Sequence, residues 1–302
     1  MEWTQNVSLG QWIAERTSGR LSGRVDDLIP RGFDAYARIF HPMPTWSGED
    51  DAAAEQTTWV ETAADFGTTM DPLAQSTTLR RMTDPWSSQS VVAPSNKTYG
   101  VPEQGTLPNL PQVAGLLRNH TTTPNSCVAA IWEGWGGLAS GGGRGFLVII
   151  PSEPTLLGRT VARVANRALR FGDWARGLLH SRRSHRLGTG ILPADVATGP
   201  RFEMPDRNYY LARLSLDELT ADDWEQRVLW ADPPFVHTPS LLWPDDRAWA
   251  LATEIDFDTT LVGGSHALIQ ALTSSRGIEA LEVPGDADLG FPWSHPRAMD
   301  LP

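Results

Sequence analysis

Cysteine and long apolar runs are nearly missing from this chain of 302 residues. Cys127 is its single cysteine, which excludes an internal disulfide bond and a metal site made of cysteines alone. No run of about 18 apolar residues occurs, so we expect no membrane-spanning helix. The first residues, MEWTQNVSLGQW, lack the basic and apolar stretches of a signal peptide. We therefore expect a cytoplasmic protein.

Positive charge is also scarce. The chain holds 36 acidic and 25 basic residues, a formal net charge of −11, and Lys97 is its single lysine. Because like charges repel, we expect no nucleic-acid partner for this surface as a whole. An acidic surface steers basic molecules toward it, so the charge favours a basic protein partner.

Hydrophobic residues make up 40 % of the chain, which is enough for a sizeable core. Alternating and helical patterns are interleaved, and hairpin-like connections outnumber crossover units. They predict a single α+β domain over residues 1–302, with a mixed, largely antiparallel sheet, packed helices and long irregular loops. We expect strands at 33–40, 127–132, 209–215, 249–257 and 279–283. We expect helices at 9–16, 58–66, 112–119 and 265–274.

Residues 156–200 differ in charge from the rest. The part from Leu156 to Leu187 holds eight Arg and one acidic residue, Asp173, hence a net charge of +7. Within 157–179 the arginines share one side of a helical wheel and apolar residues the other. We favour a basic amphipathic surface helix followed by a linker; the alternative is peripheral contact of 157–179 with an anionic membrane. An extended tail is expected at 285–302.

The most organised group of reactive side chains lies at the end of the expected strand 249–257. On such a strand Glu254, Asp256 and Asp258 would point to one face. Converging carboxylates bind a divalent cation, and two of them can act as acid and base in hydrolysis. His266 is a candidate base beside them. The alternative is a solvated strand face without chemistry.

Tryptophan is unusually frequent, with 13 residues. Its large ring carries a polar N–H, so partly buried tryptophans suit binding grooves as well as cores. Trp132, Trp135, Trp243 and Trp249 are candidate binding residues, with core packing as the alternative.

A weaker candidate site precedes the helix expected at 265–274. Gly263 and Gly264 are followed by Ser265, a good N-cap residue. Free N–H groups at a helix start can bind an anion such as phosphate. The alternative is ordinary turn chemistry before a capped helix.

Four segments of the chain resemble a group of uncharacterised actinobacterial proteins. They are FDAYARIFHP (33–42), NHTTTPNSCVAAIWEGWG (119–136), MPDRNYYLARLSLDEL (204–219) and SLLWPDDRAWALATEIDFDTTLVGGSHALI (240–269). Similar proteins tend to have an aromatic residue after the cysteine, where this chain has Val128 and Ala129. The resemblance covers about a third of the chain and implies no activity, ligand or catalytic residue.

Two functional hypotheses follow from these features. The first is a non-enzymatic protein-binding factor, similar to an immunity or antitoxin protein, whose acidic, tryptophan-rich surface takes a basic partner. It needs no cofactor. The second is a metal-assisted hydrolase that uses Glu254, Asp256 and Asp258, with a divalent cation as cofactor and His266 as possible base.

Overall fold

The computed structural model describes residues 1–47, 54–84, 87–139, 190–231 and 236–290. The chain divides into two compact units, where the sequence analysis predicts one domain. The first unit comprises Met1–Glu133 and Pro200–Pro302, and the second comprises Gly134–Gly199. In the second unit the description covers 134–139 and 190–199, with helix α7 at Ala194–Thr198. The basic segment at 156–189 therefore lies outside the described residues.

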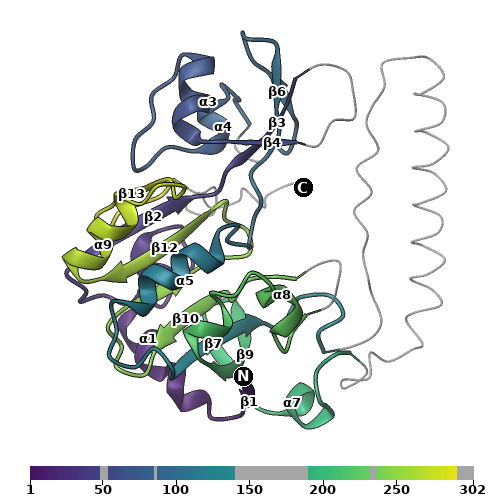
Figure 1. Ribbon diagram of the computed structural model, residues 1–302, viewed down its shortest axis with the longest axis vertical. Coiled ribbons are helices and arrows are strands. Elements are labelled where there is room, and N and C mark those ends of the chain that lie inside the picture. The colour runs from purple at the N-terminus through teal and green to yellow at the C-terminus, as the bar shows by residue number, and fades with distance from the viewer. Residues whose placement is uncertain (48–53, 85–86, 140–189, 232–235, 291–302) are drawn as a thin grey trace, which may run out of the picture. The chain divides into compact units, whose positions relative to one another are not determined.

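The first unit contains a main antiparallel sheet in the order β1-β9-β7-β10-β11-β12-β2-β13, with β8 paired to β9 (Figure 1). Its strands are β1 (Glu2–Thr4), β2 (Ala35–Phe40), β7 (Cys127–Trp132), β8 (Phe202–Met204), β9 (Arg207–Leu214), β10 (Leu241–Pro244), β11 (Ala250–Ala252), β12 (Thr259–Gly264) and β13 (Ala280–Glu282). The central strands are nearly continuous runs of buried residues because both faces of the sheet are covered.

Short helices cover both faces of the main sheet. They are η1 (Val7–Gly10), α1 (Gln11–Arg16), α2 (Val25–Leu28), α5 (Leu110–Arg118), η2 (Leu216–Glu218), α8 (Trp224–Arg227) and α9 (His266–Thr273). Trp12 and Ile13 of α1 pack with Val128 and Leu211 of the sheet. Figure 1 shows α5 and α9 beside each other at the main sheet. The expected cap is confirmed, since Ser265 Oγ accepts the N–H of Leu268 at 3.3 Å.

A smaller antiparallel sheet, in the order β4-β3-β6-β5, follows β2 in the chain. Its elements are β3 (Met43–Ser47), β4 (Glu55–Thr57), α3 (Trp59–Phe66), α4 (Ser76–Leu79), β5 (Val91–Val92) and β6 (Lys97–Tyr99). Helix α3 begins at a capping box of Thr58 and Glu61 and ends at Gly67, whose φ of 62° suits glycine. Phe40 of β2 packs on Trp59 of α3, which joins this sheet's core to the main sheet.

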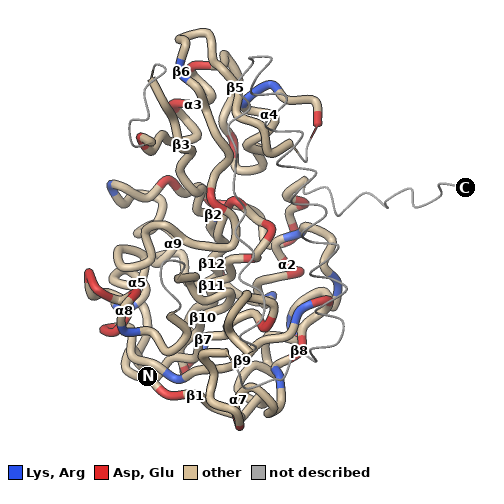
Figure 2. Tube along the Cα trace, turned by 90° about the vertical axis from the view of Figure 1, so that its right-hand side faces the viewer, with Lys and Arg blue, Asp and Glu red and all other residues tan. Residues whose placement is uncertain are grey.

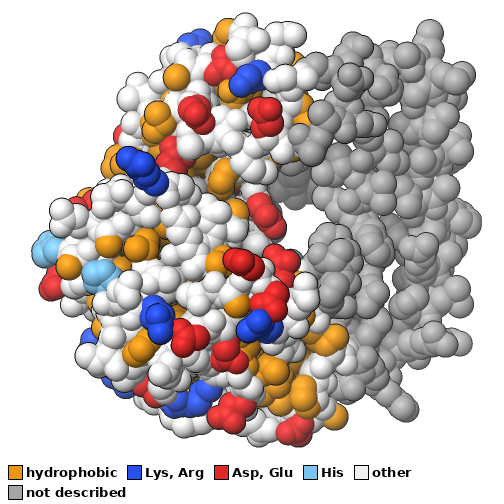
Figure 3. Space-filling view, in the orientation of Figure 1, with side chains coloured by type: hydrophobic (Ala, Val, Ile, Leu, Met, Phe, Trp, Pro, Cys, Tyr) orange, Lys and Arg blue, Asp and Glu red, His pale blue; other side chains and the backbone are white. Residues whose placement is uncertain are grey.

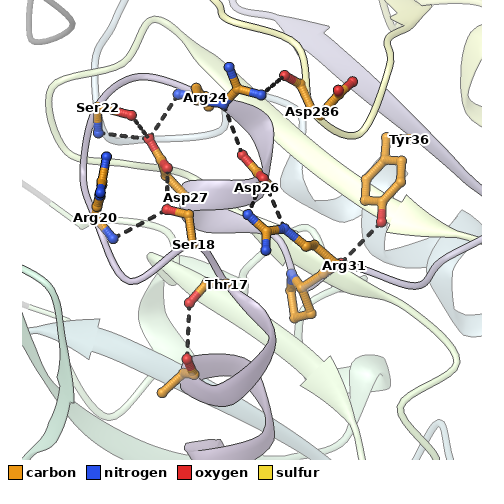
Figure 4. A network of polar contacts seen from close by, with 12 residues as sticks. Thr17, Ser18, Arg20, Ser22, Arg24, Asp26, Asp27, Arg31, Tyr36 and Asp286 are labelled. Atoms are coloured by element: carbon orange, nitrogen blue, oxygen red, sulfur yellow. Dashed lines mark hydrogen bonds and ion pairs between the residues drawn. The ribbon is translucent and has the colours of Figure 1, made fainter.

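The segment before β2 is held by a polar network around α2 (Figure 4). The carboxylate of Asp27 accepts hydrogen bonds from Ser18 Oγ, the backbone N–H and hydroxyl of Ser22, and the N–H of Arg24. Burial opposes ionisation of Asp27, but these hydrogen bonds outweigh it and lower the pKa of the carboxyl below its usual value. Asp26 pairs with Arg31 at 2.6 Å.

The α+β class and the largely antiparallel sheet are confirmed. The predicted strand at 249–257 is wrong in extent, because β11 ends at Ala252 and a turn follows in which Phe257 N–H bonds to Glu254 O. Of the predicted loose tail, residues 285–290 are described, and there Leu289 is fully buried in the core. The remainder of the tail lies outside the description. Within the part of the chain that is described, no helix has the length and apolarity to cross a membrane.

Candidate functional site

Arg207 brings together two of the three predicted carboxylates. Its Nε donates to Glu254 Oε1 at 2.8 Å, and its Nη2 donates to Asp256 Oδ2 at 2.8 Å. Arg207 begins β9, directly after the β8–β9 hairpin, and the carboxylates come from the turn between β11 and β12. The guanidinium therefore connects that turn to the start of β9.

The three charged groups differ in exposure. The side chain of Glu254 is 2 % exposed, that of Arg207 14 % and that of Asp256 41 %. Burial raises the pKa of Glu254, while the charge and hydrogen bond of Arg207 act in the opposite direction. Ionisation of the buried Glu254 therefore depends on Arg207, whereas Asp256 reaches solvent.

An aromatic side chain lies beneath this ion cluster. The guanidinium carbon of Arg207 is 5.9 Å from the ring centroid of Trp132, within the range of a cation–π contact. Trp132 pairs with Tyr209 across β7 and β9 and is partly exposed. Burial and the nearby Glu254 charge raise the pKa of Tyr209, so its hydroxyl stays neutral.

The hairpin beside this cluster adds further negative charge. Asp206, in the turn before Arg207, is exposed. Glu203 on β8 is also exposed, but it pairs with Asn208 and therefore lies on the opposite face of the sheet from Trp132 and Arg207. We name the set of Trp132, Asp206, Arg207, Glu254 and Asp256 the acidic edge. Figure 2 shows acidic positions mainly in loops and near strand ends. Figure 3 shows further acidic side chains distributed over the face that it draws.

The other face of the same strand end carries a second ion pair. Glu133 accepts hydrogen bonds from Arg201 Nε at 3.2 Å and from Asn208 Nδ2 at 2.8 Å. The Arg201 guanidinium stacks on Tyr210, 3.9 Å from the ring centroid. The contacts of Glu133 and Arg201 hold the start of β9 on the face of the sheet opposite Arg207.

Asp258, the third predicted carboxylate, belongs to a different cluster. It is 7 % exposed and accepts a hydrogen bond from Ser76 Oγ at 2.6 Å, at the start of α4. Its charge acts on two buried arginines, Arg38 and Arg80. Burial lowers the pKa of Arg38 to about 10, against the favourable charge of Asp258. The cluster joins the small sheet to the main sheet.

The predicted convergence of three carboxylates on one strand face is therefore wrong. In the described ranges no three His, Cys, Asp or Glu side chains are placed so that they could hold a metal ion. His266 starts α9 at the far end of β12, roughly 20 Å along the strand from Asp258. It cannot act as a base beside that carboxylate.

The other predicted binding residues have mixed positions. Trp243 and Trp249 are 2 % and 0 % exposed, so both belong to the core. The Trp249 indole donates to Leu117 O at 3.1 Å. Trp135 lies in the second unit and is partly exposed.

Gly263 and Gly264 lie within β12, not in a turn as predicted. A Cβ at Gly263 would come within 2.5 Å of the Phe33 ring, and one at Gly264 within 2.7 Å of Leu268 Cδ2. These glycines are required by close packing. Ser265 Oγ is engaged in capping α9.

Sequence analysis did not identify Arg207. The available signal was a basic residue directly after the turn-forming pair Pro205-Asp206 and at the start of a strand. Its partners Glu254 and Asp256 are 47 and 49 residues away in the chain, so no local sequence pattern predicts them. Comparison of the chain with protein families, with curated proteins and with solved structures finds no match.

Proposed function

We propose that this protein is a non-enzymatic binding factor of the cytoplasm that takes a basic protein partner at its acidic edge. An example of such a factor is an immunity or antitoxin-like protein that neutralises a basic toxin. The observation that carries the proposal is the partly exposed Trp132 under a guanidinium whose charge is already matched by Glu254 and Asp256.

The charge at this edge supports a basic partner. Arg207 offsets one of the two carboxylates it binds, and Asp206 adds an exposed negative charge. Together with the overall charge of −11, this field speeds encounter with a basic surface and repels an acidic one.

The aromatic ring supports a specific contact in addition to steering. Tryptophan and arginine are frequent at the energetic centres of protein interfaces because their large planar groups bury much area with little loss of freedom. Trp132 is held by its β-sheet pairing and by Arg207. It presents its remaining exposed surface in a fixed orientation.

A capture experiment tests the proposal. The tagged protein is used as bait in a lysate of its source organism, and the recovered partner is then purified for affinity measurement. We expect a stoichiometric basic protein, with binding weakened tenfold or more by Trp132→Ala and by Asp206→Asn/Asp256→Asn. Affinity should also fall with rising salt, because the negative charges of Asp206 and Asp256 are solvent-exposed and are screened by ions.

The matched control is Glu282→Gln/Asp34→Asn, which changes net charge by the same amount at exposed positions. Glu282 lies on β13, six strands from β9 and so roughly 30 Å away. Recovery of no stoichiometric partner would overturn the proposal. Equal weakening by both charge variants would assign the effect to overall charge and remove the acidic edge as the site.

A further inference from the structure

A cavity of about 340 Å³ lies in the first unit where the end of β2 meets the start of α3, and it includes no residue of the acidic edge. It is bounded by β2, by the start of α3, by the loop before α5 and by the residues leading into β13. Its walls are mainly apolar and include Ile39, Phe40, Pro42, Val60, Leu107, Pro108 and Ile278, while Thr58 and Asn109 are neutral polar residues of the lining. Its volume and lining match those of small-molecule sites.

One acidic group, Glu279, lines this apolar cavity. Its Oε2 accepts the backbone N–H of Trp59 at 2.6 Å and its Oε1 accepts that of Val60 at 2.8 Å. These two bonds fix the carboxylate against the first turn of α3. A carboxylate has about four acceptor positions, so two remain for a ligand.

The surroundings of Glu279 favour a cationic ligand. Burial raises the pKa of its carboxyl, as does the charge of nearby Glu61, against the two N–H donors that lower it. No Lys or Arg is among the residues that line the cavity. A bound cation would relieve the cost of the buried charge.

We infer that this cavity binds a primary alkylammonium group, with its methylene chain on the apolar wall and its nitrogen on the Glu279 carboxylate. Cavity, apolar lining and a single fixed carboxylate match that chemistry, since an ammonium offers three donors and no acceptor. Such a group occurs in free aliphatic amines and at the end of a lysine side chain. The inference does not depend on the proposed partner at the acidic edge.

The test is an NMR titration of the ¹⁵N-labelled protein with pentylammonium chloride. We expect saturable shifts of the Trp59 and Val60 amide signals with half-saturation at about 1–10 mM, as befits a ligand of about six heavy atoms. Pentan-1-ol has the same alkyl chain without the charge, and it should bind with less than a fifth of the affinity of pentylammonium. Nα-acetyl-lysine N-methylamide, run in parallel, distinguishes a lysine side chain from a free amine as the better ligand.

Two variants and a control complete the experiment. Glu279→Gln should weaken pentylammonium binding at least tenfold, whereas Glu282→Gln, an exposed acid on the following strand, should leave it unchanged. Val60 is 55 % exposed, so Val60→Trp tolerates the larger ring and should obstruct the cavity even where Glu279→Gln folds poorly. Non-saturable shifts, equal binding of pentan-1-ol, or undiminished binding by Val60→Trp would each overturn the inference.

Discussion

The Nη2 atom of Arg207 lies 2.7 Å from Oε1 of Glu254, a carboxylate whose side chain is 2 % exposed. The pair connects the start of β9 to the turn after β11. Removing one partner of such a pair leaves an uncompensated charge in a place that water does not reach.

Arg207→Met should therefore lower the free energy of unfolding by about 3 kcal/mol, because Glu254 loses its counter-charge. The measurement is urea denaturation at pH 7. Arg213→Met is the control, since Arg213 and its partner Asp245 are 33 % and 36 % exposed. That exposed pair should contribute less than about 1 kcal/mol to the free energy of unfolding. Equal losses in the two variants would contradict the structural role assigned to Arg207.

Asp258 should contribute more to the free energy of unfolding than its hydrogen-bond partner Ser76. Asp258→Asn removes the negative charge that Arg38 and Arg80 experience, and we expect a loss of about 3 kcal/mol. Ser76→Ala removes one hydrogen bond and should cost about 1 kcal/mol. The measurement is urea denaturation of both variants and wild type, which gives the free energy of unfolding of each. A ranking in the reverse order would show that charge is not what Asp258 contributes.

The network around Asp27 predicts a pH dependence of stability. The pKa of Asp27 is lowered in the folded protein, so its contribution is complete above the unfolded value of about 3.9 and is lost as the pH falls through the folded value. Asp27→Asn should cost about 2 kcal/mol at pH 7. The gap in melting temperature between wild type and Asp27→Asn should then narrow from pH 6 to pH 3. Asp34→Asn, at an exposed carboxylate, serves as control; a gap independent of pH would count against the network.

Cys127 should be unreactive in the folded protein. It is fully buried in β7, and burial, followed by the charges of Asp245 and Asp246, raises the pKa of its thiol to about 12. The thiolate is the nucleophile, so almost none is present at pH 8. Titration with Ellman's reagent should give no fast reaction without denaturant and one thiol per chain in 6 M guanidinium chloride (about the concentration that unfolds most domains). A fast reaction in buffer would mean that the thiol is accessible.

Local pattern predicted much of the secondary structure. The expected strand 127–132 is β7 at Cys127–Trp132, and the helix expected at 58–66 is α3 at Trp59–Phe66. These elements carry their own signals, namely an uninterrupted apolar run in the first and a capping box in the second. Alternation failed at 249–257, because a turn with regularly spaced acids has the same pattern as a strand face.

The candidate sites were less accessible to sequence reasoning. Trp132 was identified as a binding candidate and is partly exposed, whereas Trp243 and Trp249, chosen by the same argument, are buried. Residue type alone does not separate these cases, since tryptophan serves in cores and in interfaces. The cavity at Glu279 is lined by segments more than 200 residues apart in the chain, so no sequence motif predicts it.

By itself the sequence determined the acidic charge, the absence of an internal disulfide, the α+β class and the capped helices, because each depends on composition or on neighbours within a few residues. Only the tertiary structure decided which carboxylates share a partner. Glu254 and Asp256 meet Arg207, while Asp258 meets Ser76, 182 residues away. The physical reason is that a charge in a protein takes its partner from strand pairing and packing, and these bring together residues that are distant in the chain.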